Sequence, residues 1–111
     1  MNTDRELLEL AARAAGFKLH RWMGDLQNKY LLDPNFDSGL AETWNPLTDD
    51  GDALRLAVKL NMHVMVSAGA TRASWNNGIY GEVVERDKSD QLSATRRAIV
   101  RAAAAIGETM Q

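Results

Sequence analysis

The spacing of apolar and polar residues along the chain predicts three helices. The first covers residues 4–15, because Thr3 and Glu6 have the spacing of a capping box just before an apolar-periodic stretch. The last begins at Ser89 or Asp90 and runs to about residue 109. Its expected buried stripe consists of Leu92, Ile99, Ala102, Ala103, Ile106 and Met110.

The segment 44–60 contains the second helix, which is the most apolar of the three. In its last eight residues only Arg55 and Lys59 are polar. A helix that is apolar so far round its circumference is normally buried against more than one neighbour. We therefore expect this helix at the centre of the molecule, with Leu54 and Val58 in the core.

Several short segments have the composition and alternation of β-strands. They cover residues 17–22, 29–32, 62–68, 71–75 and 79–85. The segment 62–68 is apolar on both faces except at His63, as is typical of an interior strand. The last two segments flank Asn77 and Gly78, and Asn-Gly strongly indicates a hairpin.

The order of these elements, α-β-β-α-β-β-β-α, predicts a single α+β domain over residues 1–111. We expect a mainly antiparallel sheet of four or five short strands sandwiched by the three helices, since this arrangement buries an apolar face of every element. Residues 33–47 contain two prolines, Gly39 and scattered polar residues, and this composition predicts a loop.

Composition and charge narrow the range of functions. Hydrophobic residues make up 45% of the chain and charged residues 25%, as in ordinary globular proteins. The absence of cysteine excludes disulfides and thiolate chemistry and fits a reducing compartment. No signal-peptide pattern and no membrane-spanning apolar run is present, so we expect a cytoplasmic protein that does not associate with a membrane. The net charge of −2 makes no general case for nucleic acid as a partner.

The predicted loop is acidic and carries part of a calcium-binding pattern. Asp33, Asn35 and Asp37 match the first three ligand positions of a helix-loop-helix calcium site. Ser38 stands where that motif has glycine, and Trp44 stands where it has the bidentate glutamate. A solvated acidic loop is therefore favoured, and a divalent-metal or hydrolytic site on this loop is kept as an alternative.

The sequence contains no catalytic signature. His20 and His63 lack the paired spacing of a zinc site, and no nucleophile elbow or phosphate-binding glycine loop is present. We expect His63 to be a core or edge residue. The prediction is a protein without enzymatic activity, catalytic residues, metal or cofactor.

Four arginines support an alternative function in nucleic-acid binding. Arg96, Arg97 and Arg101 lie near one another on the last predicted helix, and Arg72 lies close to Trp75 beside the hairpin turn. Arginine can contact phosphates, and an exposed tryptophan can stack on a base. Nearby acids almost balance these charges, so a weak nucleic-acid-binding protein is the second interpretation.

The three tryptophans suggest a surface for protein contacts. Trp22, Trp44 and Trp75 each lie at a predicted strand end or turn, where such residues usually form half-buried lids over a core. If they instead formed an exposed cluster, they would mark a protein–protein surface. The candidate interaction surface combines the turn after Trp44, the neighbouring acids and the hairpin, and consists of Trp44, Asp49, Asp50, Asp52, Trp75 and Asn77.

Three segments resemble a known group of small proteins. Residues 44–60, in which Trp-Asn-Pro precedes Asp-Gly-Asp-Ala-Leu, resemble the phage ABA-sandwich domain proteins of tailed phages and prophages, as do residues 94–108 and 4–16. The resemblance implies a sheet between helical layers, a phage or prophage origin and a bacterial cytoplasm, but no biochemical activity. We expect a non-enzymatic accessory protein that contacts a host factor or forms a homodimer.

Overall fold

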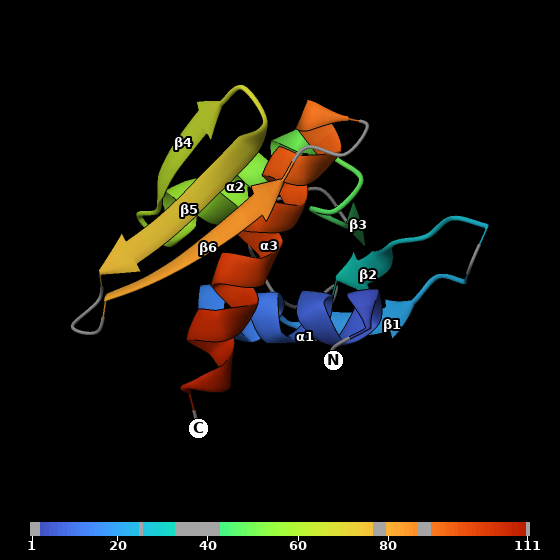
Figure 1. Cartoon of the computed structure of the whole chain (residues 1–111). Helices are drawn as coiled ribbons and strands as arrows, with labels where there is room; N and C mark the ends of the chain where they lie inside the picture. Colours follow the sequence, from blue (N-terminus) through green and yellow to red (C-terminus); the bar gives the residue numbers. More distant parts are fainter. Residues whose placement is uncertain (1–2, 25, 33–42, 77–79, 87–89, 111) are drawn as a thin grey trace.

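In the computed structural model, residues 3–24, 26–32, 43–76, 80–86 and 90–110 are described, and they form three helices and six strands in an α+β arrangement (Figure 1). The elements are α1 (Asp4–Ala15), β1 (Leu19–Trp22), β2 (Tyr30–Leu32), β3 (Thr43–Trp44), α2 (Asp50–Lys59), β4 (His63–Ser67), β5 (Ala70–Asn76), β6 (Tyr80–Arg86) and α3 (Gln91–Glu108). Within these residues, no helix is long and apolar enough to cross a membrane.

The strands form two antiparallel sheets of three strands each, in the orders β1-β2-β3 and β4-β5-β6. The expected single sheet of four or five strands is therefore wrong. The difference arises at β3, which lies inside the segment that was predicted as a loop. Trp44 of β3 pairs with Tyr30 of β2, and this pairing carries the tryptophan side chain into the core.

Helix α3, rather than α2, is the central helix. It packs against α1 on one side and against β5 and β6 on another (Figure 1). The contact with α1 is very close, because a Cβ atom added to Gly107 would lie 2.1 Å from the carbonyl oxygen of Leu10. Toward the sheet, Ala98 and Ala102 pack against Ala73 of β5. Small residues on α3 thus allow both neighbours to approach it closely.

Helix α2 is buried on one side only, which corrects the prediction that it forms the centre. Leu56 is fully buried, with Ala53 and Ala57 beside it in the core. Leu54 and Val58 are 64% and 68% exposed. The sequence showed apolar residues almost all round this helix, but its neighbours cover only the side that carries Leu56.

Strand β4 is an edge strand, and the prediction of an interior strand is wrong. It pairs with β5 on one side, and within the described residues no strand pairs with its other side. Met65 and Val66 are 49% and 51% exposed, and His63 is exposed as well. The three helices also do not sandwich this sheet, since α3 packs on one face and the other face, which carries Arg72 and Ser74, is partly open.

The local signals at the helix starts are confirmed. Thr3 and Glu6 form both hydrogen bonds of a capping box. Asp49 caps α2 by accepting from the N–H of Asp52, and Asp90 caps α3. The stripe of α3 is confirmed for the central members, Ile99, Ala102, Ala103 and Ile106, whereas its two end members, Leu92 and Met110, are exposed.

Candidate functional site

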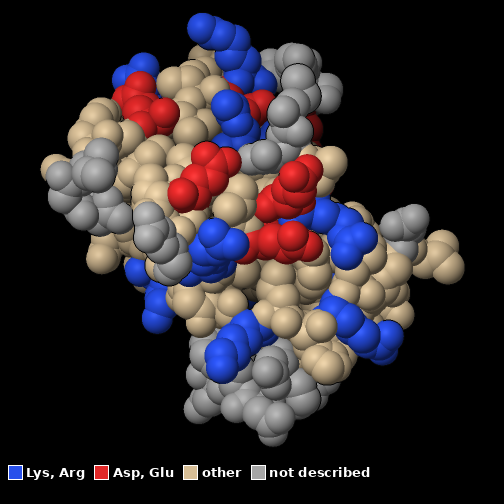
Figure 2. Space-filling model, turned by 90° about the horizontal axis from the view of Figure 1, so that it is seen from below, with Lys and Arg blue, Asp and Glu red and all other residues tan. Residues whose placement is uncertain are grey.

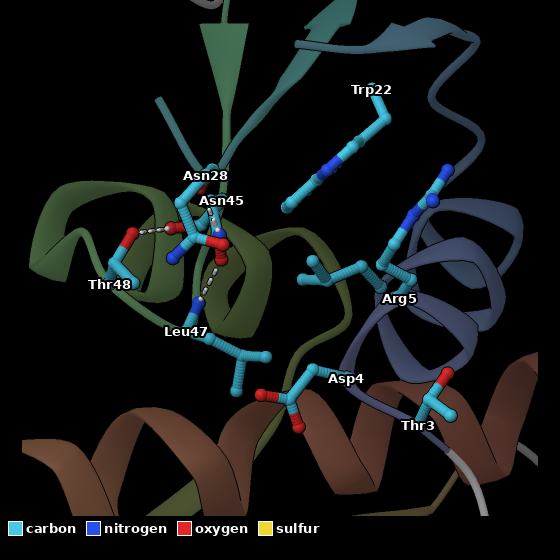
Figure 3. Close-up of a pocket in the computed structure, with 9 residues that line it drawn as sticks. Thr3, Asp4, Arg5, Trp22, Asn28, Asn45, Leu47 and Thr48 are labelled. Atoms are coloured by element: carbon cyan, nitrogen blue, oxygen red, sulfur yellow. Dashed lines mark hydrogen bonds between the residues drawn. The ribbon is translucent and has the colours of Figure 1, made fainter. Parts of the chain in front are cut away.

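A cleft of about 490 Å³ lies beside the start of α1 (Figure 3). Its volume is within the range of small-molecule pockets. Residues from α1, from β1, from the connection before β2 and from the turn after β3 line it. They are Thr3, Asp4, Arg5, Leu8, Trp22, Asn28, Asn45, Leu47 and Thr48.

Asn45 forms one wall of the cleft, and its backbone N–H and side-chain amide make three hydrogen bonds. Its backbone N–H donates to Asp52 Oδ2 at 3.0 Å. Its side-chain Nδ2 donates to the carbonyl of Asn28 at 2.6 Å, and its Oδ1 accepts from the N–H of Leu47 at 2.9 Å (Figure 3). Pro46 follows directly and keeps Asn45 out of helical geometry. The predicted turn is therefore present, and its amide side chain joins two distant segments.

Arg5 and Trp22 line the cleft opposite Asn45 (Figure 3), and Arg5 also lies close to the buried ring of Tyr30. The guanidinium carbon of Arg5 lies 5.1 Å from the ring centroid of Trp22 and 5.9 Å from that of Tyr30, within the range of cation–π contacts. The two rings meet edge to face at 5.0 Å. The hydroxyl of Tyr30 donates to Glu9 at 2.6 Å. Burial is the main cause that raises the pKa of Tyr30, and the hydrogen bond to Glu9 is the second.

The polar groups of the cleft are largely engaged with other parts of the chain. Asp4 pairs with Arg97 at 3.1 Å, and Thr48 bonds to the carbonyl of Asn45. The indole N–H of Trp22 is buried and has no hydrogen-bond partner among the described residues, and solvent does not reach it. The described residues contain no group of three or more His, Asp or Glu that could hold a metal ion. The cleft thus holds the Asn-Pro turn against α1 and presents few free polar atoms.

Two members of the predicted interaction surface are buried. Trp44 is 1% exposed and meets Phe17 edge to face at 5.8 Å, so it belongs to the core and not to a surface. Asp52 is 5% exposed, and its carboxylate accepts from the N–H of Asn45 and from Arg55. These placements correct the expectation for both residues. The buried carboxylate fixes the turn after β3 to the first turn of α2.

The other described members, Asp49, Asp50 and Trp75, lie in two different parts of the fold. Asp49 is the cap of α2, and Asp50 pairs with Arg96 at 2.6 Å. Trp75 lies in the other sheet, where its half-buried ring packs over Gly81 of β6. Asn77 lies outside the described residues, as do Asp33, Asn35 and Asp37, the residues of the calcium-binding pattern. Trp22 and Trp75 are half-buried, as expected of lids, and Trp44 is buried completely.

Each of the four arginines considered for nucleic-acid binding has a carboxylate partner. The pairs are Arg72–Glu82 (3.4 Å), Arg96–Asp50 (2.6 Å), Arg97–Asp4 (3.1 Å) and Arg101–Glu85 (2.5 Å). Arg96 also donates to the carbonyl of Leu47. Figure 2 shows basic and acidic side chains next to one another on the face that it presents. A phosphate would have to compete with these carboxylates for every arginine.

The free edge of β4 is the feature that sequence reasoning missed. From residue 60 to residue 71 the chain carries no Asp, Glu, Lys or Arg. On the face of this sheet that carries Arg72 and Ser74, a hollow of about 180 Å³ reaches from β4 across β5 to β6. It is lined by His63, Met65, Arg72, Ser74, Tyr80 and Glu82. The absence of charge in this segment can be seen in the sequence. It does not distinguish an interior strand from an unprotected edge strand, because both lack charged residues.

Comparison with protein-family models, curated proteins and solved structures finds no match for this chain. The likeness to phage ABA-sandwich domain proteins therefore stays a prediction.

Proposed function

We propose that this chain is a non-enzymatic accessory protein of a phage or prophage that acts by binding protein at the free edge of β4. The observation that supports this function best is an edge strand without a charged residue and with Met65 and Val66 half exposed. A partner segment in extended conformation would add a strand to β4-β5-β6, and its backbone hydrogen bonds would supply affinity.

Edge strands present unpaired N–H and C=O groups that attract other strands, and most proteins protect such edges with charges, proline or bulges. The opposite edge of the same sheet has this protection, because β6 contains Glu82, Glu85 and Arg86. Strand β4 has none of it, and its pairing with β5 runs without a bulge from His63 to Ser67. The asymmetry between the two edges favours β4 as a contact surface.

Exposed apolar residues on α2 extend this argument. Helix α2 precedes β4 directly in the chain, and Leu54 and Val58 are separated by one helical turn on its exposed side. Burial of such residues against a partner is favourable because it removes apolar area from water, although area alone does not set the affinity of a protein complex. A partner that contacted both the edge of β4 and these residues would combine backbone hydrogen bonds with apolar burial, as protein interfaces do.

The test uses two lysine substitutions in the same cross-strand row. Arg72 of β5 lies opposite Met65 of β4 on one side and opposite Val84 of β6 on the other, and both of these residues are exposed. Met65→Lys and Val84→Lys thus add the same charge beside the same arginine, one at each edge of the sheet.

The tagged protein would be used as bait in a bacterial lysate that also contains an untagged copy, with retained proteins identified by mass spectrometry. We expect wild type and Val84→Lys to retain the same protein and Met65→Lys to lose it. Circular dichroism would show that both variants are folded. Equal retention by the two variants, or no specific retention by wild type, would refute the proposed function.

A further inference from the structure

We infer that the strand which completes the edge of β4 is β4 of a second copy, paired antiparallel about a two-fold axis beside Met65. This inference rests on the proposed function and names the partner for the same edge. It follows from the direction of the backbone groups of β4, from the side chains that the pairing would bring together, and from the absence of charge.

The backbone directs hydrogen-bonding groups to the free edge at two residues. A two-residue turn closes on the pair Ser67 and Ala70, and the residues on either side of such a turn form a hydrogen-bonded pair. Hydrogen-bonded and non-hydrogen-bonded pairs alternate along antiparallel strands. Val64 and Val66 therefore direct their N–H and C=O groups away from β5 and toward the free edge.

A second β4 matches these groups when the axis passes beside Met65. Val64 of each copy then lies opposite Val66 of the other, and each of these pairs can exchange two backbone hydrogen bonds. Met65 lies opposite Met65 of the second copy in a non-hydrogen-bonded pair, in which Cα atoms are about 4.5 Å apart. Every outward backbone group of Val64 and Val66 thus finds a partner, as an isologous interface requires.

The side chains fit the same register. Val64 points to the side of the sheet that faces the core, and Val66, two residues on, points to the same side and is half exposed. Pairing would place the valines of the two copies together on that side and the two methionines together on the other. Met65 and Val66 would then lose exposed apolar area at the same interface.

Electrostatics does not oppose a second copy. Two identical surfaces repel when charged residues lie near the axis, and like charges directly opposite in a strand pair are destabilising. The chain carries no charged residue between Lys59 and Arg72, so the strand and both of its ends are neutral. The net charge of −2 per chain is small and lies elsewhere in the sequence.

The register can be tested by exchanging charge at position 65. In the proposed dimer Met65→Lys places two lysines opposite each other, and Met65→Glu places two glutamates opposite each other. A mixture of the two variants places lysine opposite glutamate. Val84→Lys, at the other edge of the sheet, serves as the matched control.

Sedimentation velocity of the purified full chain over about 10–500 µM would measure the dimerisation constant, a range suited to a small strand-to-strand interface. We expect a monomer–dimer equilibrium for wild type and Val84→Lys. Each charged variant alone should raise the dissociation constant at least about tenfold, and mixing the two variants should restore the dimer.

A wild-type chain that stays monomeric over this range would overturn the inference, as would a mixture that does not restore association. If wild type is monomeric while Met65→Lys still abolishes retention of another protein from lysate, the second copy is wrong and the proposed function stands. If Met65→Lys changes neither association nor retention, both are wrong.

Discussion

Replacement of Gly107 by alanine tests the close contact between α1 and α3. Alanine is the better helix former, and in an exposed helix the change would stabilise by about 1 kcal/mol. At this position the new Cβ would lie 2.1 Å from the carbonyl oxygen of Leu10, a backbone atom of α1 that cannot rotate away. The two effects oppose each other, so the sign of the result is informative.

The size of the expected loss of stability follows from the distance between the added Cβ atom and the carbonyl oxygen of Leu10. An ordinary contact of a Cβ atom is 3.4 Å or longer, so α1 must move away from α3 by at least about 1.3 Å. A gap of only 0.5–1 Å already forfeits roughly a quarter to a half of each contact's dispersion energy. Ala11 and Ala103, which are fully buried in the same core, would be affected by this separation. Overpacking of this kind costs about 1–3 kcal/mol, and we expect a net loss of at least about 1 kcal/mol after the gain in helix propensity.

Urea unfolding followed by circular dichroism would measure this loss, with an unchanged m-value as the condition for comparing free energies. Gly51→Ala is the matched control in α2, because the nearest atoms to its added Cβ are 3.2 Å away and belong to the side chains of Arg55 and Asp49. We expect this control to be neutral or stabilising by up to about 1 kcal/mol. A Gly107→Ala variant as stable as wild type would refute the close contact.

Two further predictions concern α2 and α1. Leu56→Ala should lower the free energy of unfolding by about 2–5 kcal/mol and Leu54→Ala by less than about 1 kcal/mol, because only Leu56 is fully buried; equal losses in urea unfolding would contradict the one-sided burial of α2. The hydrogen bond from the backbone of Thr3 lowers the pKa of Glu6, so the carboxylate stabilises the fold above its unfolded pKa, and this contribution is lost as the pH falls through the lower folded pKa. Glu6→Gln should therefore show a smaller fall in melting temperature between neutral and acidic pH than wild type does, and an identical fall would count against the capping box.

The local features of the fold were predictable because short stretches of sequence determine them. Thr3, Asp49 and Asp90 cap the three helices by bonds to residues two or three positions away. The hairpin of β5 and β6 follows from the strand pattern around the Asn-Gly pair. In each of these cases the interacting groups are neighbours in the chain, so their spacing can be read directly.

The candidate site was much less predictable. The stack of Arg5 on Trp22 and Tyr30 joins α1 to two strands, and the bond from Asn45 to Asn28 joins segments 17 residues apart. Nothing in the spacing of these residues indicates that they meet. Trp44 was assigned to a surface because it is a large residue close to a turn, but its pairing in β3 carries it into the core.

The sequence by itself determined the α+β class, the helix starts and the hairpin, because capping, periodicity and turn chemistry act over a few residues. Only the tertiary structure decided that the apolar helix α2 has an exposed side and that the uncharged strand β4 lies at an edge. An apolar residue is buried only where a neighbour covers it, and the arrangement of neighbours depends on contacts between distant parts of the chain. Strand β4, which the sequence predicts as an interior strand, therefore carries the edge at which we propose that a partner binds.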